Sequence, residues 1–339
     1  MSLDAAVLAV DGGGVKTDLA LVGSRGNLVA FARGGGSQAH YLGVEGCVEV
    51  LETLLERAIA RAGGRPLDRP FASIACFLIA GADLPEESAS LRARLEQLGW
   101  ARRHVVDNDT VALLRAGTDR GWGVAVVCGA GINCLGRAPD GREARFPSLG
   151  EISGDWGGGV EIGLAALAAA ARSADGRGPR TVLETAVPAH FELREPIDVA
   201  RALHHQQMPV SRLGELAPLV LALCDEDPVA TRIVHRLADE VIALAGAALR
   251  RLDLTATDPD VVLGGGVLRS VSAGIVERIA HGIQEVAADA QVLVSPSEPI
   301  VGAVLLGLDS LGADAHAGAR ARVELDAEVA GVVSGEVVR

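Results

Sequence analysis

A short run near the start of the chain, residues 7–18, constrains the fold more than any other stretch. It reads VLAVDGGGVKTD: an apolar strand, Asp11, the glycines Gly12–Gly14, and the approach to a second apolar run at Leu19–Val22. This order indicates a tight hairpin, because glycine has no Cβ and reaches positive φ cheaply. Successive backbone N–H groups in such a turn form a concave anion site, which favours a phosphate ligand.

Two better-known glycine loops are excluded by the neighbouring residues. A P-loop requires Gly-Lys-Ser/Thr, but Lys16 follows Val15. A dinucleotide-binding turn requires a further glycine and then a helix, whereas residues 18–24 indicate a strand. The hairpin therefore predicts a phosphate loop of another kind, with Asp11 placed to hold a nucleotide's metal ion. The alternative is an ordinary β-turn with an Asx-type aspartate.

The composition indicates a globular protein that binds neither nucleic acid nor a membrane. Of 339 residues, 49% are hydrophobic and 22% charged, and the net charge is −13. Such an acidic chain lacks the basic patch that nucleic acid or an anionic membrane requires. The five cysteines are scattered without a C-x-x-C pair, which favours reduced thiols in the cytoplasm. We find no signal-type N-terminus and no apolar run of membrane-spanning length.

Hydrophobic periodicity predicts the same α/β layout twice. Each repeat has three strands followed by alternating helices and strands, which predicts a mixed five-stranded sheet flanked by helices. The expected strands are 7–10, 19–22, 27–31, 71–79 and 105–106, then 124–127, a run from 135, 143–146, 261–263 and 291–294. The expected helices are 44–61, 85–98, 110–116, 160–172, 196–206, 211–224, 229–252, one directly after 266, and 300–308.

These repeats predict two lobes and a tail. The first lobe covers residues 1–117, and the second covers 118–311 with a helical insertion at about 160–255. The last helix is expected to pack back on the first lobe. Residues 312–339 show little apolar periodicity before 329–333, which predicts a loosely attached tail.

Glycine turns recur at matching strand ends. The second hairpin, Cys128–Cys134, reads CGAGINC and shares glycine at the first and third turn positions with the first hairpin, and a third turn lies at Gly264–Gly266. Two such hairpins can hold a polyphosphate, and the third turn can border an adenine ring. The alternative is a chance scatter of glycines, and we interpret Gly34–Gly36 as such a loop or as a substrate loop.

Five motifs, in order, resemble one family. They are DGGGVKTD at 11–18, NDT at 108–110, CGAGIN at 128–133, SGDWGGG at 153–159 and LGGGVL at 263–268. Together they look like the N-acetylglucosamine kinase type of sugar kinase, a group that includes the BadF/BadG-type ATPases. This group belongs to the superfamily of acetate kinase, sugar kinases, heat-shock chaperone ATPases and actin. The resemblance therefore implies duplicated ribonuclease-H-like domains, of the actin-like ATPase kind, over residues 7–310.

The resemblance implies ATP and Mg²⁺ as ligands and a sugar as substrate. Asp11 would hold Mg²⁺, and Asp109 would be the base toward the sugar hydroxyl. The residues implied to bind ATP are Gly12, Gly13, Gly14, Lys16, Thr17, Gly129, Ala130, Gly131, Gly264, Gly265 and Gly266. The positions implied to contact the sugar are Gln38, Gly81, Asp83, Asn108, Asn133 and Asp155. A homodimer is expected from the resemblance alone.

The residues around Asp109 support its implied role independently. Asp109 follows a short strand where a helix begins, which points its side chain into the crevice at the carboxyl end of a sheet. A carboxylate there can take the proton of an acceptor hydroxyl. The alternative is that Asp109 caps the helix, because Asp and Asn are preferred N-caps. Asp107 lies closer to the strand body and is the weaker candidate for the base, and for Asp155 the alternative is a turn aspartate.

Four departures from the family pattern bear on the sugar more than on the reaction. Val15 replaces a common threonine, Gln38 a common asparagine, Trp156 an acidic residue and Ala80 a serine. The zinc-binding cysteines and the helix-turn-helix of repressor-type relatives are missing from this sequence. A sugar-responsive transcription factor is therefore disfavoured.

The sequence thus predicts a cytoplasmic ATP-dependent kinase of a hexose or amino sugar, with N-acetylglucosamine 6-phosphate as the expected product. The alternative is a BadF/BadG-type activator, which couples ATP hydrolysis to electron transfer into an acyl-CoA reductase. Such activators carry an iron–sulfur cluster that bridges two subunits, and the cysteines here are not obviously placed for that. A non-catalytic nucleotide-dependent protein is disfavoured because Asp11 and Asp109 are both present.

Overall fold

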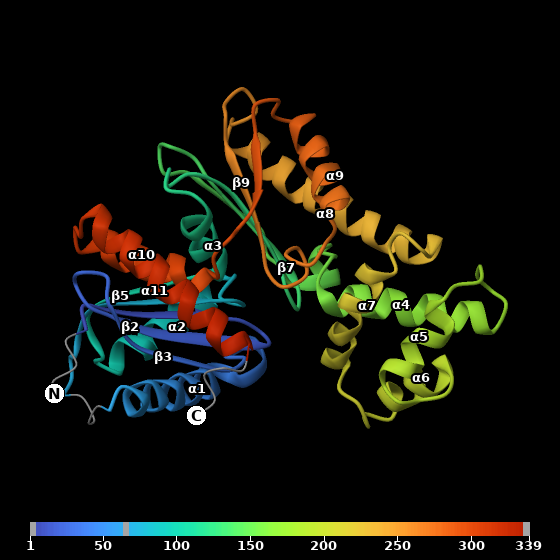
Figure 1. Ribbon diagram of the computed structural model, residues 1–339, viewed down its shortest axis with the longest axis horizontal. Helices are drawn as coiled ribbons and strands as arrows, with labels where there is room; N and C mark the ends of the chain where they lie inside the picture. The colour runs from blue at the N-terminus through green and yellow to red at the C-terminus, as the bar shows by residue number, and fades with distance from the viewer. Residues whose placement is uncertain (1–4, 64–67, 335–339) are drawn as a thin grey trace. The chain divides into compact units, whose positions relative to one another are not determined.

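The computed structural model describes residues 5–63 and 68–334 and divides into two compact units. The first unit comprises the chain up to Trp122 together with the segment from Ser295 onwards, and the second is Gly123–Val294. Each unit contains a five-stranded mixed sheet with helices packed against it (Figure 1). The prediction of two such sheets is therefore confirmed.

The first sheet has the strand order β3-β2-β1-β4-β5. β1 pairs antiparallel with β2 and parallel with β4, so the first hairpin lies in the middle of the sheet. Every residue of β1 is buried, as expected for an apolar strand covered on both faces. The strands are β1 Val7–Gly12, β2 Lys16–Val22, β3 Leu28–Gly35, β4 Ala72–Ile79 and β5 Ala101–Asp107.

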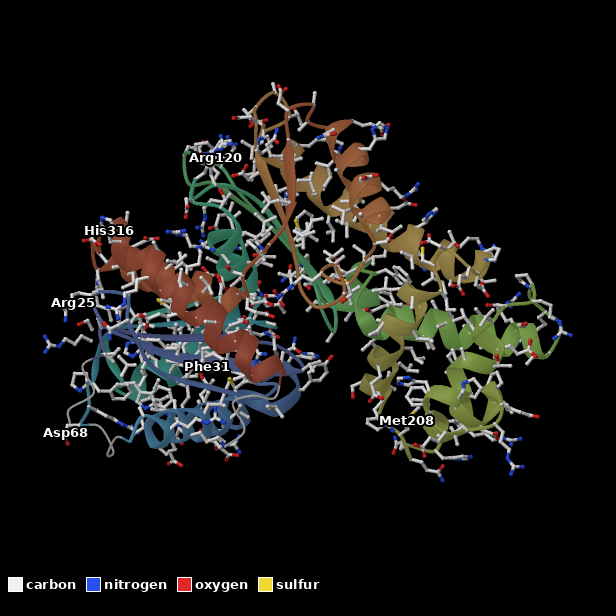
Figure 2. All side chains as sticks on the ribbon, viewed as in Figure 1. Arg25, Phe31, Asp68, Arg120, Met208 and His316 are labelled. Atoms are coloured by element: carbon white, nitrogen blue, oxygen red, sulfur yellow. The ribbon has the colours of Figure 1, made fainter. Side chains whose placement is uncertain are left out.

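Helices cover both faces of this sheet. α1 (Ala39–Arg61) and α2 (Pro85–Gln97) share one hydrophobic core with the strands. α3 (Asp109–Gly117), α10 (Pro299–Ser310) and α11 (Ala315–Ser334) pack on the other face, and Figure 1 shows α10 and α11 across the sheet from α1. Phe31 of β3 lies beneath this second layer and is buried (Figure 2). The first sheet is therefore held between two helical layers.

The second sheet repeats the first strand for strand. Its order, β8-β7-β6-β9-β10, corresponds to β3-β2-β1-β4-β5, with antiparallel pairs among the first three strands and parallel pairs beyond them. α8 (Pro228–Arg251) packs on β6, β7 and β8, and α9 (Ala273–Gln284) packs on α8. The strands are β6 Gly123–Cys128, β7 Ile132–Arg137, β8 Glu143–Arg145, β9 Asp260–Gly264 and β10 Gln291–Val294.

The helical insertion is organised around α4 (Gly159–Ala174). Packed against α4 are α5 (Leu183–His190), α6 (Pro196–His204), a 3-10 helix at Val210–Leu216 and α7 (Ala217–Ala222). The single helix predicted over 211–224 is wrong, because Pro218 has no N–H to continue α-helical hydrogen bonds and instead lies in the first turn of α7. The apolar periodicity did not predict α5. The helix expected directly after residue 266 is also wrong, since turns occupy 266–270 and α9 begins at Ala273.

The segment predicted as a loose tail forms α11, which packs on α10 and β3. Its buried residues recur at every fourth position: Ala317, Ala321, Leu325 and Val329. Two of these are alanines, so the apolar stripe is weak in the sequence although the spacing is helical. Residues 335–339 of the predicted tail lie outside the described residues.

The elements α8, α1 and α11 span 24, 23 and 20 residues, and α1 is kinked at Gly43, whose backbone angles are not helical. α8 and α1 bury apolar residues on one side and carry charged residues on the other. Within the described ranges, no helix is both long and apolar enough to cross a membrane.

The packing of α10 on α3 generates a stability prediction. A Cβ at Gly302 would lie 1.8 Å from the carbonyl oxygen of Ala112, so Gly302→Ala forces the two helices apart. We expect a loss of about 1–3 kcal/mol in the free energy of unfolding, measured as a lower midpoint in urea.

The matched control is Gly274→Ala in α9, where the nearest atom to an added Cβ is 4.0 Å away. This change should leave the midpoint unchanged or raise it, because alanine is the better helix former. Equal midpoints for the two variants would contradict the close approach of α10 to α3.

Candidate functional site

The first glycine hairpin is closed by backbone hydrogen bonds. The Gly13 N–H donates to the Lys16 carbonyl oxygen over 2.8 Å. In the ladder below this turn, Asp11 pairs with Asp18 and Gly12 with Thr17. The turn therefore projects from the middle of the sheet at the carboxyl end of β1, where ligands of α/β sheets commonly bind.

A second glycine segment supports this turn from behind. A Cβ at Gly36 would lie 2.3 Å from the Gly14 carbonyl oxygen. Next to it, the Ser37 N–H donates to the Gly13 carbonyl oxygen over 3.1 Å, and the Thr17 hydroxyl donates to Ser37 Oγ over 2.9 Å. Gly36 therefore packs on the hairpin and is not a chance glycine in an ordinary loop. The interpretation of Gly34–Gly36 as a chance or substrate loop did not foresee that Gly36 and Ser37 support the turn, although their position directly after the third strand was a usable signal.

Charged side chains surround the base of the hairpin. Asp18 is fully buried and accepts two hydrogen bonds from Arg33, at 2.6 and 2.7 Å. The Lys16 ammonium lies 3.3 Å from Asp18 Oδ2 and 2.8 Å from Glu298 Oε2. Asp11 is 7% exposed. Burial raises the pKa of Asp11 well above its usual value, and the positive charge of Lys16 opposes that rise.

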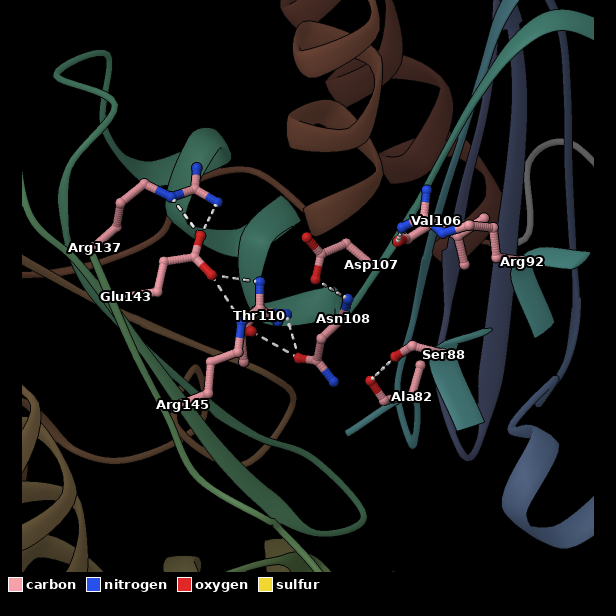
Figure 3. Close-up of polar contacts among 10 residues, drawn as sticks. All are labelled: Ala82, Ser88, Arg92, Val106, Asp107, Asn108, Thr110, Arg137, Glu143 and Arg145. Atoms are coloured by element: carbon pink, nitrogen blue, oxygen red, sulfur yellow. Dashed lines mark hydrogen bonds and ion pairs between the residues drawn. The ribbon is translucent and has the colours of Figure 1, made fainter. Parts of the chain in front are cut away.

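The N-cap of α3 is Asn108, so the alternative that Asp109 caps this helix is wrong. The Asn108 side-chain oxygen accepts from the Thr110 N–H at 3.0 Å and from the Thr110 hydroxyl at 2.7 Å (Figure 3). Its amide nitrogen donates to Asp83 Oδ1 over 2.8 Å. Asp109 is therefore the first residue of the helix proper, and hydrogen bonds from the backbone N–H groups of Asp109 and Thr110 to its carboxylate oppose the effect of burial on its pKa.

The carboxyl group of Asp109 has a raised pKa. Burial raises its pKa from 3.8 to about 7, and the negative charge of Asp83 adds to the effect. Asp109 also raises the pKa of Asp11 electrostatically, so the first hairpin and the start of α3 lie in one electrostatic environment within the first unit. A carboxylate with a pKa near neutrality is a candidate for proton transfer.

The structure brings Gln38 next to Gly81 and Asn108 next to Asp83. Gly81 has φ +78°, and a Cβ there would lie 2.8 Å from Gln38 Cγ. The backbone just before Gly81 is tied to the first hairpin, because the Ala80 N–H donates to the Gly12 carbonyl oxygen over 2.7 Å. The four sugar positions implied for the first unit therefore form two contacting pairs, at the ends of β4 and β5 and at the start of α1.

The second hairpin, in the second unit, is also backed by a glycine segment. The Gly129 N–H donates to the Gly131 carbonyl oxygen over 2.9 Å, and the Gly159 N–H at the start of α4 donates to the Gly129 carbonyl oxygen over 2.8 Å. A Cβ at Gly158 would lie 2.3 Å from the Ala130 carbonyl oxygen. The second turn therefore depends on α4 much as the first depends on Gly36.

The third glycine turn contacts the end of β6 in the same unit. Gly265 has φ +86°, and a Cβ there would lie 2.3 Å from the Cys128 carbonyl oxygen. That oxygen accepts from the Val267 N–H over 3.0 Å. The structure therefore brings Gly264–Gly266 together with the second hairpin. The family resemblance implies that both turns bind ATP.

Asn133 and Asp155 make local hydrogen bonds in the second unit. The Asn133 side-chain oxygen accepts from the Cys134 N–H over 2.7 Å, and the Asp155 carboxylate accepts from the Ser153 hydroxyl. Trp156 is 5% exposed, and the Arg236 guanidinium lies 4.0 Å from its ring centroid. The Trp156 side chain is therefore a packing element of the second unit.

The acidic residues suit Mg²⁺ better than a multi-ligand protein metal site. Across residues 5–63 and 68–334, no group of three or more His, Cys, Asp or Glu is arranged to hold a metal ion. Mg²⁺ is usually bound through one or two carboxylates, waters and substrate phosphates. Asp11, a buried carboxylate beside a glycine turn, fits that pattern.

Comparison with known proteins defines the family. The chain matches the model of the BadF/BadG/BcrA/BcrD ATPase family over residues 8–307 and belongs to that family. It is 28% identical over 267 residues to the N-acetylmuramic acid/N-acetylglucosamine kinase of Clostridium acetobutylicum, covering 78% of this chain and 86% of that one. It is 25% identical over 314 residues to the N-acetyl-D-glucosamine kinase of Dictyostelium discoideum, covering 89% of this chain and 98% of that one. The predicted family is therefore confirmed.

The fold is similar to the crystal structure of a Chromobacterium violaceum protein provisionally named as an N-acetylglucosamine kinase. The TM-score is 0.72 at 23% identity, and the match covers 89% of this chain and 99% of the other. This likeness confirms the predicted fold class of duplicated, helix-flanked mixed sheets.

The backing of the first hairpin generates a prediction about nucleotide binding. Gly36→Ala places a Cβ against the Gly14 carbonyl oxygen and so displaces the turn. We expect about tenfold weaker binding of Mg·ATP, measured by isothermal titration calorimetry.

Gly35→Ala is the matched control, because no heavy atom of the described chain lies within 4 Å of the added Cβ. It should bind Mg·ATP as the unchanged protein does. Equal affinities for the Gly36→Ala and Gly35→Ala variants would contradict a supporting role for Gly36.

Proposed function

We propose that this chain is an ATP-dependent sugar kinase that transfers the γ-phosphoryl group of ATP to the 6-hydroxyl of N-acetylglucosamine. The family is an ATPase family, and both curated relatives reported above are named as N-acetylglucosamine kinases. The Clostridium relative is also named for N-acetylmuramic acid. Both names support an amino sugar as the phosphoryl acceptor.

The observation that carries this proposal is the position of the Asp109 carboxyl group and its raised pKa. Asn108 is the N-cap of α3 in its place, and the Asp109 carboxylate lies in the first turn of that helix, just beyond the end of β5. With a pKa of about 7, roughly half of the groups are ionised at neutral pH, and the carboxylate is basic enough to accept a proton. These are the properties required of a general base toward a sugar hydroxyl.

The proposed step is a direct phosphoryl transfer. The sugar oxygen forms a bond to the γ-phosphorus, and the bond from that phosphorus to the β,γ-bridging oxygen breaks to leave ADP. Asp109 accepts the hydroxyl proton as the new bond forms. Because this chemistry depends mainly on positioning and charge neutralisation, the fixed N–H groups of the glycine turns are suited to it.

The phosphate and metal contacts follow from the turn residues. We assign the turns at Gly12–Gly14, Gly129–Gly131 and Gly264–Gly266, with Lys16 and Thr17, to ATP. Asp11 would hold Mg²⁺, which neutralises phosphate charge when bound. Binding of the cation would also keep Asp11 ionised despite its burial.

The remaining sugar positions complete the proposal. We assign Gln38, Gly81, Asp83 and Asn108 to the sugar, together with Asn133 and Asp155 of the second unit. The Asn108 side chain also orients the start of α3, because its oxygen caps the helix and its nitrogen donates to Asp83. Following the family resemblance, we further propose that the enzyme is cytoplasmic and homodimeric.

The activator alternative is disfavoured by the cysteines. A cluster that bridges two subunits needs thiolates at the surface, but all five cysteines of this chain are buried. Burial raises the pKa of Cys47 and Cys76 to about 12, so both thiols stay protonated at neutral pH.

The function is tested by ADP release from Mg·ATP across a panel of hexoses and N-acyl hexosamines. We expect N-acetylglucosamine to give the largest stimulation. Asp109→Asn should reduce sugar-dependent ADP release by about 10²- to 10⁴-fold, because the amide cannot accept the proton. If no sugar stimulates ADP release, the kinase proposal fails and the activator becomes the better hypothesis.

The matched control is Asp107→Asn, the same substitution two residues earlier. Asp107 Oδ1 accepts from the Asn108 N–H over 2.8 Å, which an amide oxygen can also do. This variant should keep most of its activity. Equal losses at positions 107 and 109 would contradict the assignment of Asp109 as the base.

The pH profile gives an independent check. The base works only when ionised, so kcat should rise with pH through about 7 and level off above it. One unit below that value, kcat should be about tenfold lower than the plateau. Saturating Mg²⁺ should be used, so that the raised pKa of Asp11 does not add a second acid limb. A flat profile between about pH 5.5 and 8 would contradict this role for Asp109.

A further inference from the structure

We propose that Glu298 is a positioning residue that holds the Lys16 ammonium in place for the phosphates of the nucleotide. The inference rests on the proposed function, because it concerns the nucleotide contacts of the first hairpin. Glu298 lies at the start of α10, 282 residues from Lys16 in the sequence. Neither the motifs nor the comparisons assign it a role.

The backbone of Lys16 is fixed, but its side chain is long and flexible. The Lys16 carbonyl oxygen accepts a hydrogen bond from the Gly13 N–H, and Lys16 pairs with Gly35 of β3 in the sheet. The side chain is 36% exposed. A lysine side chain that becomes ordered only when a ligand binds loses rotamer freedom, and this loss weakens the binding. A protein group that orders the side chain beforehand removes that loss from the free energy of binding.

Of its two carboxylate partners, Glu298 is the one that orders Lys16. Asp18 already accepts two hydrogen bonds from Arg33, so its charge is compensated without Lys16. The distance from the Lys16 Nζ to Glu298 Oε2 is 2.8 Å, against 3.3 Å to Asp18 Oδ2. An ammonium has three N–H donors, so these two contacts leave one for a phosphate oxygen.

The position of Glu298 suits this task. It is the N-cap residue of α10, yet its side chain accepts no hydrogen bond from the described first turn of that helix. The next residue, Pro299, has no N–H to be capped. The Glu298 carboxylate therefore contacts Lys16 and does not cap α10.

The segment before Glu298 is held in place by α11. The Ser297 hydroxyl donates to Asp326 Oδ2 over 3.0 Å and accepts from Arg322 over 3.1 Å. The Ser295 hydroxyl donates to the Ser297 carbonyl oxygen over 2.8 Å. Ser295 and Ser297 are both buried. α11 therefore helps to fix the position from which Glu298 reaches the hairpin.

Loss of the Glu298 charge would redirect Lys16. The other carboxylates that act on Lys16 are Asp18 and Asp11. Since Asp18 is already paired with Arg33, the ammonium would be drawn toward Asp11, the proposed Mg²⁺ ligand. The two cations would then compete for one carboxylate. The expected consequence is weaker binding of the metal–nucleotide complex and no direct effect on the sugar.

The test measures the dissociation constant of Mg·ADP by isothermal titration calorimetry and the KM values of both substrates. Glu298→Gln should weaken Mg·ADP binding and raise the KM for ATP by about fivefold to tenfold, with the KM for the sugar unchanged. Lys16→Met should weaken binding at least as much. In the double variant, Glu298→Gln should add nothing to Lys16→Met, because Glu298 acts through Lys16.

Two further variants separate this role from a structural one. Glu298→Asp keeps the charge but withdraws the carboxylate by one methylene, so it should keep the melting temperature and bind Mg·ADP as weakly as Glu298→Gln. Asp309→Asn removes another carboxylate of α10, one that pairs with Arg115, and should bind Mg·ADP normally. Unchanged Mg·ADP binding in Glu298→Gln, or additive losses in the double variant, would overturn the inference. If the unmodified protein fails to bind Mg·ADP, the proposed function itself fails.

Discussion

Both glycine hairpins that we propose to bind phosphate depend on backbone packed directly against backbone. Gly36 lies behind the first turn and Gly158 behind the second, and at each a Cβ would come within 2.3 Å of a carbonyl oxygen of the turn. The turns carry few side chains that could hold them, so these contacts decide where their N–H groups point. Preorganised N–H groups stabilise phosphate charge without rearranging during the reaction, which is the main demand of phosphoryl transfer.

The electrostatics of the first unit follow from the same hairpin. Its strands bury Asp11 and Asp18, and the two carboxylates are treated differently by their surroundings. Arg33 neutralises Asp18, whereas burial raises the pKa of Asp11 against the opposing positive charge of Lys16. Burial raises the pKa of Asp109 as well. Asp18 is thus a structural carboxylate. Asp11 and Asp109 keep the properties that suit the roles we propose for them, cation binding and proton acceptance respectively.

The repeated layout, the glycine turns and Asp109 could be predicted because each is written in neighbouring residues. The choice of cap for α3 could not, because Asn108 and Asp109 are both good N-caps. That choice depends on where β5 ends, and β5 is paired with β4 through Asp107, which leaves Asn108 as the first residue beyond the strand. The helix Ala315–Ser334 was not predicted for a related reason, since alanines such as Ala317 and Ala321 mark a buried face only weakly.

The sequence by itself determined the family, the duplicated sheets and the polar residues at the strand ends, because periodicity and motif spacing are local properties of the chain. Only the tertiary structure decided that Gly36 and Gly158 support the turns, and that Glu298 reaches Lys16 across 282 residues. Close approach of distant backbone leaves no trace in the sequence except a glycine. An ion pair between remote elements leaves none, because its partners are set by how helices and strands pack and not by their spacing along the chain.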